Sequence, residues 1–286
     1  MDNYVLKTPG KINLFLEIKG QRPDSRHEIL TLYFPVWGLS DQVGIVFGGS
    51  GIQVHCTTVP DVPQDRSNLA VRAAEAFYAA AGRPCPGISI QLDKRLPVAG
   101  GMGGGSSDAG AVLRLLQKYS GVELPRDVLE KTALSIGSDV PYFLNPVPAI
   151  GRGGGEQLFL VEMQDSLPIL LVPGCFPISA AWAYRHWKDA AQTNLSDLDG
   201  LLSSLVSCDY AQAGKLLRND LEPAALQKFP LLKKIAGLLR GSGGFPLMSG
   251  SGSSMFALYP DFPARIRAFD LLASEFEALD LPLIKI

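Results

Sequence analysis

Apolar and polar residues alternate along the first third of the chain with the two-residue period of β-strands. Between Ile12 and Ile18 one face is apolar, and Asn13 and Glu17 lie on the other. Further strand-like runs are found at 5–7, 29–36, 42–47, 52–56 and 87–92. We expect 5–7 and 12–18 to form a strand pair, because the turn-forming dipeptide Pro9-Gly10 lies between them. This part of the chain is therefore predicted to be rich in β-structure.

Apolar residues at spacings of three and four predict helices in both halves of the chain. One helix begins at Asn68 and ends at Gly82, one follows Gly110, and one runs from Pro125 to Gly137. Helical patterns recur at 180–187, 198–205, 210–217, 231–239 and 264–276, and strand-like runs at 157–161, 169–172, 255–259 and 281–286. Strands and helices do not alternate regularly, as they would in a doubly wound sheet, so the predicted fold class is α+β.

The chain has 286 residues, which is enough for one large or two ordinary domains. Residues 151–155 read Gly-Arg-Gly-Gly-Gly, and a glycine-rich segment of this kind suits a hinge between domains. We therefore expect an N-terminal domain at 1–153 and a C-terminal domain at 154–286.

The densest candidate chemistry lies in the loop from Leu96 to Gly110, between a predicted strand and a predicted helix. Five of the six residues from 100 to 105 are glycine, and glycine lets successive backbone N–H groups converge on one anion. Residues 106–108 are good N-cap residues, so the helix would direct its N-terminus to the same place. The loop is predicted to bind a polyphosphate, and a glycine-rich turn without a ligand is the alternative.

Several other classes of phosphate-binding protein are excluded by their motifs. The last glycine is followed by Ser-Ser-Asp and not by Lys-Ser or Lys-Thr, which excludes a Walker loop, and no complete G-x-G-x-x-G occurs. Neither H-R-D nor D-F-G is present, which excludes a protein kinase. A serine hydrolase that uses residues 105–109 as a nucleophile elbow is a rival reading, although the closing glycine of that motif is missing.

Charge and composition limit the partners. The chain has 26 Lys and Arg and 28 Asp and Glu, for a net charge of −2, and no basic run occurs. We therefore expect neither nucleic acid nor a membrane surface as a partner. No segment approaches the ~18 apolar residues of a membrane helix, and the first residues alternate instead of forming a signal peptide, so a cytoplasmic protein is expected. The scattered cysteines and histidines predict neither a zinc site nor disulfides.

Two charged residues outside the glycine loop are candidates for catalysis. Lys11 follows Pro9-Gly10 at the edge of a predicted strand, and the alternative is a solvated surface lysine. Asp139 lies beside apolar residues just before Pro141, where it is either the N-cap of a short turn or a carboxylate in a partly apolar pocket. The two roles of Asp139 are compatible.

Four separate segments together resemble one family. They are Pro9 to Leu14, Pro97 to Ala109, Gly137 to Pro141, and Met248 to Ser253. In this order they resemble the GHMP kinases, named for galactose, homoserine, mevalonate and phosphomevalonate, and the resemblance spans the whole chain. It implies an S5-like N-terminal domain, a ferredoxin-like C-terminal domain and an active site between them. Within the family, the match favours members that phosphorylate the 2-hydroxyl of a cytidine-diphosphate-linked methylerythritol, a small-molecule substrate of the non-mevalonate isoprenoid pathway.

The resemblance also implies roles for single residues. Asp139 would be the base that accepts the hydroxyl proton, Lys11 would neutralise the acceptor oxygen and the transferring phosphoryl group, and Mg²⁺ would assist. The implied ATP-binding residues are Asn68, Lys94, Pro97, Val98, Ala99, Gly100, Gly101, Met102, Gly103, Gly104, Gly105, Ser106 and Ser107. On the substrate side the implied residues are Asn13, Arg26, His27 and Tyr184.

One departure from the family pattern bears on the substrate. Ser25-Arg26 stands where the family usually carries Gly-Tyr, so Arg26 would either pair with a substrate diphosphate or mark a different acceptor. Two rival functions follow from the same motifs: another GHMP kinase, of the homoserine or mevalonate type, and a nucleotide-binding sensor without catalysis. Both a monomer and a homodimer are compatible with the sequence.

Overall fold

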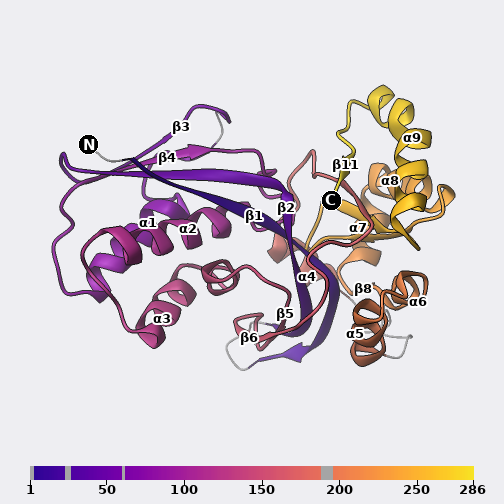
Figure 1. The fold of residues 1–286 in the computed structure, drawn as a ribbon, viewed down its shortest axis with the longest axis horizontal. Helices are drawn as coiled ribbons and strands as arrows, with labels where there is room; N and C mark the ends of the chain where they lie inside the picture. The colour runs from indigo at the N-terminus through magenta and orange to yellow at the C-terminus, as the bar shows by residue number, and fades with distance from the viewer. Residues whose placement is uncertain (1–2, 23–26, 60–61, 188–195) are drawn as a thin grey trace. The chain divides into compact units, whose positions relative to one another are not determined.

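The computed structural model describes residues 3–22, 27–59, 62–187 and 196–286. By its contacts the chain divides into two compact units, each built from three segments. Unit 1 consists of Met1–Gly10, Pro35–Val98 and Gly103–Val147, and unit 2 consists of Lys11–Phe34, Ala99–Met102 and Pro148–Ile286. Figure 1 labels most of the helices and strands of both units.

Two long strands contribute residues to both units. β1 is Asn3–Gln21 and β2 is His27–Phe47. The sequence predicted each as two shorter strands, with a turn at Pro9-Gly10, and this prediction was wrong because the backbone stays extended through both residues. Tertiary hydrogen bonds override the turn propensity: the Pro9 carbonyl accepts from Ser107 Oγ at 2.7 Å, and the Lys11 N–H donates to the Met102 carbonyl at 2.9 Å.

In unit 1 the strands have the order β3-β4-β2-β1. β3 (Ile52–Cys56) runs parallel to β4 (Ile88–Asp93), and β4 runs antiparallel to β2, with Asp93 opposite Gln42. Buried and more exposed residues alternate along β4, as the sequence pattern predicted. One face of this sheet therefore belongs to a hydrophobic core.

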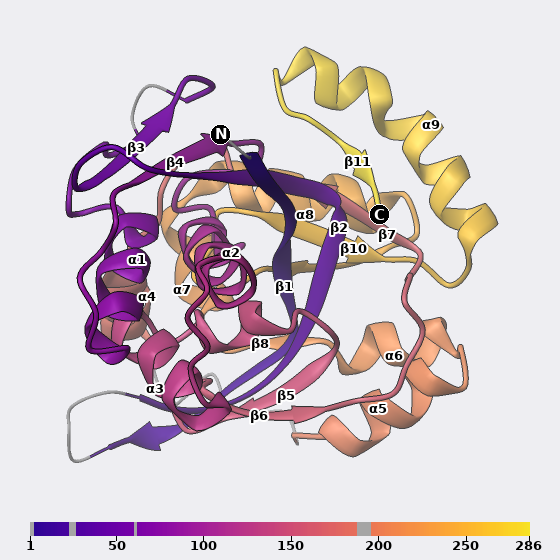
Figure 2. The same ribbon diagram turned by 60° about the vertical axis from the view of Figure 1, so that its left-hand side comes forward.

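The helices of unit 1 are α1 (Leu69–Ala80), α2 (Gly104–Tyr119), α3 (Arg126–Ile136) and the short 3₁₀ helix η1 (Pro141–Leu144). α1, α2 and α3 lie on one side of this sheet (Figures 1 and 2). α1 packs against α2 and α3, and α2 packs against η1. The last contact needs a glycine in α2, because a Cβ on Gly110 would lie 2.5 Å from the Cβ of Phe143. Helices and sheet share one core.

In unit 2, short strands pair with β1 and with β2 and add to the sheet. β8 (Arg218–Asn219) pairs in parallel with β1, with Asn219 opposite Leu16. β5 (Ala149–Arg152) pairs antiparallel with β2 and with β6 (Gln157–Leu160). A separate antiparallel sheet has the order β11-β7-β10-β9. Its strands are β7 (Ile169–Val172), β9 (Phe245–Met248), β10 (Met255–Leu258) and β11 (Ile284–Lys285).

The helices of unit 2 are α4 (Ala180–His186), α5 (Leu198–Val206), α6 (Tyr210–Leu216), α7 (Glu222–Lys228), α8 (Pro230–Gly241) and α9 (Phe262–Ala278). α8 packs against β9 and β10, and α9 packs against β7. These contacts bury the second hydrophobic core. The predicted α+β class is therefore confirmed by both units.

The glycines at 151–155 lie at the turn between β5 and β6, where the Gly155 N–H donates to the Arg152 carbonyl at 3.0 Å. The last crossing of the chain from unit 1 to unit 2 is at Val147–Pro148, and the domain boundary expected at 153 stays a prediction. Two earlier segments also belong to unit 2: Lys11–Phe34, which holds parts of β1 and β2, and Ala99–Met102 of the glycine loop.

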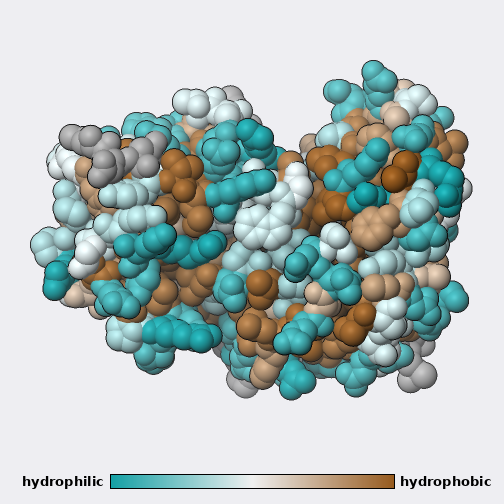
Figure 3. All heavy atoms as spheres, viewed as in Figure 1, coloured by the Kyte–Doolittle hydropathy of each residue, from teal (hydrophilic) through white to brown (hydrophobic). Residues whose placement is uncertain are grey.

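Polar and apolar residues are interspersed on the face seen in Figure 3. Within the described ranges, no helix combines the length and the hydrophobicity that crossing a bilayer requires.

Candidate active site

The glycine loop leads into α2 through residues with positive φ. Gly101 and Gly103 have φ values of 81° and 72°, and Gly103 is the N-cap residue of α2. The prediction that residues 106–108 cap this helix was wrong, because the helix already begins at Gly104 and those residues lie within its first turns. No side chain of the described residues caps α2, so the first N–H groups of the helix point at the loop without such a partner. This arrangement suits an anion.

The backbone of the loop packs closely at two glycines, tightly at Gly104 and too closely for any side chain at Gly101. In unit 1, a Cβ on Gly104 would lie 3.3 Å from the Leu96 Cβ and 3.4 Å from Lys94 Nζ. In unit 2, a Cβ on Gly101 would overlap the carbonyl oxygen of Ser249. The glycines therefore let the backbone approach neighbours on both sides of the loop.

Ser107 anchors the start of α2 to β1 within unit 1. Its hydroxyl donates to the Pro9 carbonyl and lies 2.7 Å from the Thr8 hydroxyl, and its N–H donates to the Gly103 carbonyl at 2.8 Å. The side chain is fully buried. Of the implied ATP-binding residues, Ser107 is thus one whose polar groups already have protein partners.

Lys94 lies at the centre of a buried ionic cluster in unit 1. Its Nζ pairs with Asp41 on β2 and, at 2.6 Å, with Asp108 on α2. The other oxygen of Asp41 accepts hydrogen bonds from the N–H groups of Arg95 and Leu96, at 2.6 and 2.8 Å. Asp41 therefore ties the segment before the glycine loop to the sheet, and it also joins the helix after the loop through Lys94.

Two carboxylates, those of Asp41 and Asp108, share the one ammonium group of Lys94, and the pKa values of Lys94 and Asp108 are both raised. Burial raises the pKa of Asp108 to about 7, against the opposing effect of Lys94. Burial alone would lower the pKa of Lys94, but the charges of Asp108 and Asp41 raise it above its ordinary value. Asp108 Oδ1 is buried and has no hydrogen-bond partner among the described residues. The cluster therefore carries a surplus negative charge when both carboxyls are ionised.

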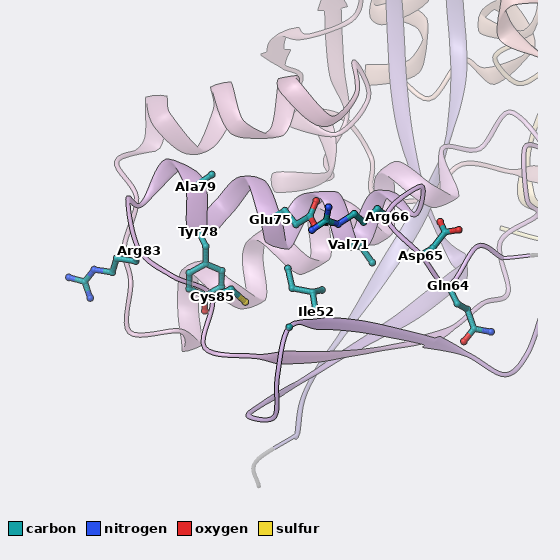
Figure 4. A pocket seen from close by; sticks show the side chains of 11 residues that line it. Ile52, Gln64, Asp65, Arg66, Val71, Glu75, Tyr78, Ala79, Arg83 and Cys85 are labelled. Carbon is teal, nitrogen blue, oxygen red and sulfur yellow. The ribbon is translucent and has the colours of Figure 1, made fainter.

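Asn68 caps α1, as the sequence predicted. Its Oδ1 accepts from the Ala70 N–H at 2.9 Å, and its Nδ2 donates to the Pro63 carbonyl at 2.7 Å. A groove of about 560 Å³ runs between α1 and β3, beside the segment that precedes this cap (Figure 4). Arg66 spans part of the groove and pairs with Glu75 at 2.9 Å.

Asp139 lies in the turn between α3 and η1. Val140, and not Asp139, is the N-cap residue of η1, so the interpretation of Asp139 as a cap was wrong. The side chain is half-buried. Burial raises the pKa of Tyr142, and the charge of Asp139 adds to that shift. Asp139 is followed in the chain by the buried residues Val140, Tyr142 and Phe143, and its catalytic role stays a prediction.

Lys11 is buried in unit 2, so the surface-lysine alternative was wrong. Its Nζ donates to Asn13 Oδ1 at 2.8 Å and to the Gly101 carbonyl at 3.1 Å. The Asn13 amide donates in turn to Thr31 Oγ1 at 2.8 Å, and Thr31 donates to the Phe15 carbonyl. Lys11 and Asn13 are thus brought together by their spacing on one face of β1, although the sequence analysis had given them separate roles.

His27 and Tyr184 are also brought together in unit 2. Their rings stack with centroids 4.6 Å apart at an interplanar angle of 17°. The Trp187 ring lies edge-on to His27, with centroids 6.1 Å apart. Arg26 falls outside the described residues. Among the described residues, no group of three or more His, Cys, Asp or Glu could hold a metal ion.

Sequence reasoning missed four residues that support these groups: Asp41, Thr31, Trp187 and Asn219. A polar pair, Ser40-Asp41, interrupts an otherwise apolar run, and this was the signal that could have identified Asp41. Asn219 donates hydrogen bonds to the carbonyls of Met248 and Gly250, which lie about thirty residues further along the chain, so local spacing does not indicate these contacts.

The fold and the glycine loop agree with comparisons to known proteins. Residues 68–145 match the family model described as the GHMP kinases N terminal domain. A homoserine kinase from Cytophaga hutchinsonii shares the fold, with a TM-score of 0.78 at 18% identity over 99% of this chain and 93% of that one. Loop, fold and family model together define a GHMP kinase.

Relatives with higher sequence identity show to which group of GHMP kinases the chain belongs. A 4-diphosphocytidyl-2-C-methyl-D-erythritol kinase from Prosthecochloris aestuarii is 34% identical over 99% of this chain and 98% of its own, and one from Geobacter sulfurreducens is 33% identical over 95% of each. A crystal structure of 4-(cytidine 5'-diphospho)-2C-methyl-D-erythritol kinase has a TM-score of 0.79 at 33% identity, over 95% of this chain and 96% of that one. The chain belongs to the 4-diphosphocytidyl-2-C-methyl-D-erythritol kinase family.

Proposed function

We propose that the protein transfers the γ-phosphoryl group of ATP to the 2-hydroxyl of 4-diphosphocytidyl-2-C-methyl-D-erythritol. Full-length similarity to kinases of that name supports the substrate. The observation that carries the activity is the start of α2, where Gly103 and Gly104 leave uncapped N–H groups facing the glycine loop. A triphosphate is the ligand that such a cradle suits.

The proposed reaction needs one base and one cation. The substrate oxygen bonds to the γ-phosphorus, the bond from that phosphorus to the β-phosphate oxygen breaks, and ADP leaves. Asp139 takes the hydroxyl proton, and the Lys11 ammonium neutralises charge on the acceptor oxygen and the phosphoryl group. A buried amine that is oriented by Asn13 and by the Gly101 carbonyl suits this role, because its position is set before the substrate arrives.

On the nucleotide side, we propose that residues 97–107 contact the phosphates and that Asn68 and Lys94 contribute to the adenosine side. The Lys94 amine already pairs with two carboxylates, so it contributes by placing the loop as well as by any contact of its own. We propose that Mg²⁺ enters with ATP, because Mg²⁺ commonly keeps several waters and binds through phosphates and few carboxylates. Bound there, it would neutralise phosphate charge.

On the acceptor side, Asn13, His27 and Tyr184 are proposed to bind the cytidine end. Stacked rings supply an aromatic face, and an imidazole and an amide supply partners for the edge of a base. Arg26 is proposed to reach the diphosphate. We further propose that the protein works in the cytoplasm as a monomer or homodimer.

Purified protein tests the proposal when it is incubated with ATP, Mg²⁺ and one acceptor at a time: the cytidine-linked alcohol, homoserine or mevalonate. Turnover is expected with the first alone. Turnover with one of the others would favour another GHMP kinase, and ATP binding without turnover would favour a nucleotide sensor.

The base assignment has its own test. Asp139→Asn is expected to lower kcat about 10²- to 10⁴-fold while ATP binding persists. Asp127→Asn is the matched control, because Asp127 is an exposed carboxylate of α3 that pairs with Lys131 at 3.2 Å. Equal activity of the two variants would remove Asp139 from the mechanism.

A further inference from the structure

A second glycine-rich segment of unit 2 packs against Lys11. Residues 249–254, here the glycine–serine loop, connect β9 to β10. A Cβ on Gly250 would lie 3.1 Å from Lys11 Nζ and 3.0 Å from the Gly101 carbonyl oxygen, so the amine rests directly on this loop. Ser249 Oγ also donates to the Gly101 carbonyl, at 3.0 Å. The position of the ammonium group therefore depends on the position of the loop.

The buried side-chain amide of Asn219, in β8, holds the glycine–serine loop by hydrogen bonds. Asn219 Nδ2 donates to the Met248 carbonyl at 2.7 Å and to the Gly250 carbonyl at 2.8 Å. Its Oδ1 accepts from the Leu221 N–H at 3.0 Å, which fixes which way the amide faces. The residue is 5% exposed, so water does not replace these bonds readily.

The place of Asn219 is itself fixed to the strand that carries Lys11. Asn219 is in β8 and lies opposite Leu16 of β1. The next residue, Asp220, donates its N–H to the Leu16 carbonyl at 2.9 Å and accepts from the Ile18 N–H at 2.8 Å. One short strand therefore connects β1, which carries Lys11, to the glycine–serine loop, against which the Lys11 amine packs.

Only a carboxamide of this length satisfies all three bonds. Aspartate has the same shape but two acceptors, so it would face the Met248 and Gly250 carbonyls with no hydrogen to donate. Two buried carbonyls would then lose their partner, and the carboxylate would repel both.

We propose that Asn219 is a positioning residue of the active site: it holds the glycine–serine loop against Lys11 and Gly101, and so sets the ammonium group for phosphoryl transfer. This inference rests on the proposed role of Lys11. Displacement of a reacting group by about 1 Å can lower the rate about 10²-fold.

The test compares Asn219→Asp with Asn145→Asp, an exposed asparagine in unit 1, and with Ser249→Ala, which removes only the bond from the loop to Gly101. For each variant, kcat and KM are measured well below the melting temperature, and binding stoichiometry for a non-hydrolysable ATP analogue gives the fraction of intact sites. Acetylation of Lys11 by acetic anhydride, followed by mass spectrometry without substrate, reports the exposure of the amine.

Asn219→Asp is expected to lower kcat on the order of 10- to 100-fold per intact site and to speed acetylation of Lys11 several-fold. Ser249→Ala should change both in the same direction by less, and Asn145→Asp should change neither. Wild-type kcat and Lys11 labelling in Asn219→Asp would overturn the inference. If that variant does not fold, wild-type values in Ser249→Ala would overturn it. An inactive wild-type protein would overturn the proposed function instead, because the labelling needs no turnover.

Discussion

Asp108→Asn should make the stability of unit 1 less dependent on pH. In the folded protein the pKa of Asp108 is raised from 3.8 to about 7, mainly by burial. An acid with a raised pKa stabilises the fold fully below its unfolded pKa, and this stabilisation is lost as pH rises to the folded pKa. The wild-type protein should therefore lose stability between about pH 4 and pH 7. Asparagine at this position does not titrate, so the variant should not show this loss of stability.

The magnitude follows from the same values. Between pH 5.5 and pH 8 the wild-type protein passes through the last 1.5 or so pH units below the folded pKa, which corresponds to about 2 kcal/mol of unfolding free energy. The stability of Asp108→Asn relative to wild type should therefore rise by about 2 kcal/mol over this range. Costs of the substitution that do not depend on pH cancel in this comparison. So does the titration of Glu222, whose pKa is also raised to about 7 by burial.

Urea unfolding at the two pH values measures the difference. Trp37 is the one tryptophan of unit 1 in the sequence, so a background with Trp182→Phe and Trp187→Phe reads that unit by fluorescence. Asp93→Asn is the control, because Asp93 is also a carboxylate of unit 1 but is partly exposed, with its Oδ2 3.5 Å from a guanidinium nitrogen of Arg95. A stability difference for Asp108→Asn that is the same at both pH values would refute the reasoning, because Asp108 would then be ionised throughout.

Two further predictions concern packing and the substrate. Gly110→Ala should destabilise the protein by about 1–3 kcal/mol, because the new Cβ would meet Phe143. Gly237→Ala in α8 should stabilise it by up to about 1 kcal/mol, because nothing lies within 4 Å of the new Cβ. Thermal unfolding measures both variants, and unchanged stability of Gly110→Ala would contradict the packing argument. Tyr184→Leu should raise KM for the cytidine-linked alcohol and leave KM for ATP unchanged, and steady-state kinetics showing the reverse would move Tyr184 to the nucleotide side.

The fold class and the glycine loop could be predicted from the sequence because both depend on local patterns. The start of α2 could not. Residues 106–108 have the better N-cap propensity, yet Gly103 takes the cap because its positive φ turns the chain into the helix earlier. Local preference for a turn at Pro9-Gly10 likewise yields to hydrogen bonds with residues about ninety positions away.

The candidate site shows the same division. Motif resemblance named Lys11 and Asn13 separately, but their hydrogen bond and the burial of the amine depend on Gly101 and the glycine–serine loop. Asp41 pairs with Lys94, which lies 53 positions further along the chain, and no local pattern around either residue predicts the pair. Contacts of this range come from strand pairing and packing, which no single segment encodes.

The pairing of β1 with β8 has a consequence during synthesis. Phe15 and Leu16 lie opposite Arg218 and Asn219, about 200 residues later in the chain. At about 5–20 residues per second, a ribosome needs on the order of 10–40 s to make that interval. The edge of β1 at Phe15 and Leu16 therefore lacks its β8 partner for all of that time, and an unpaired strand edge is a template for pairing with another chain.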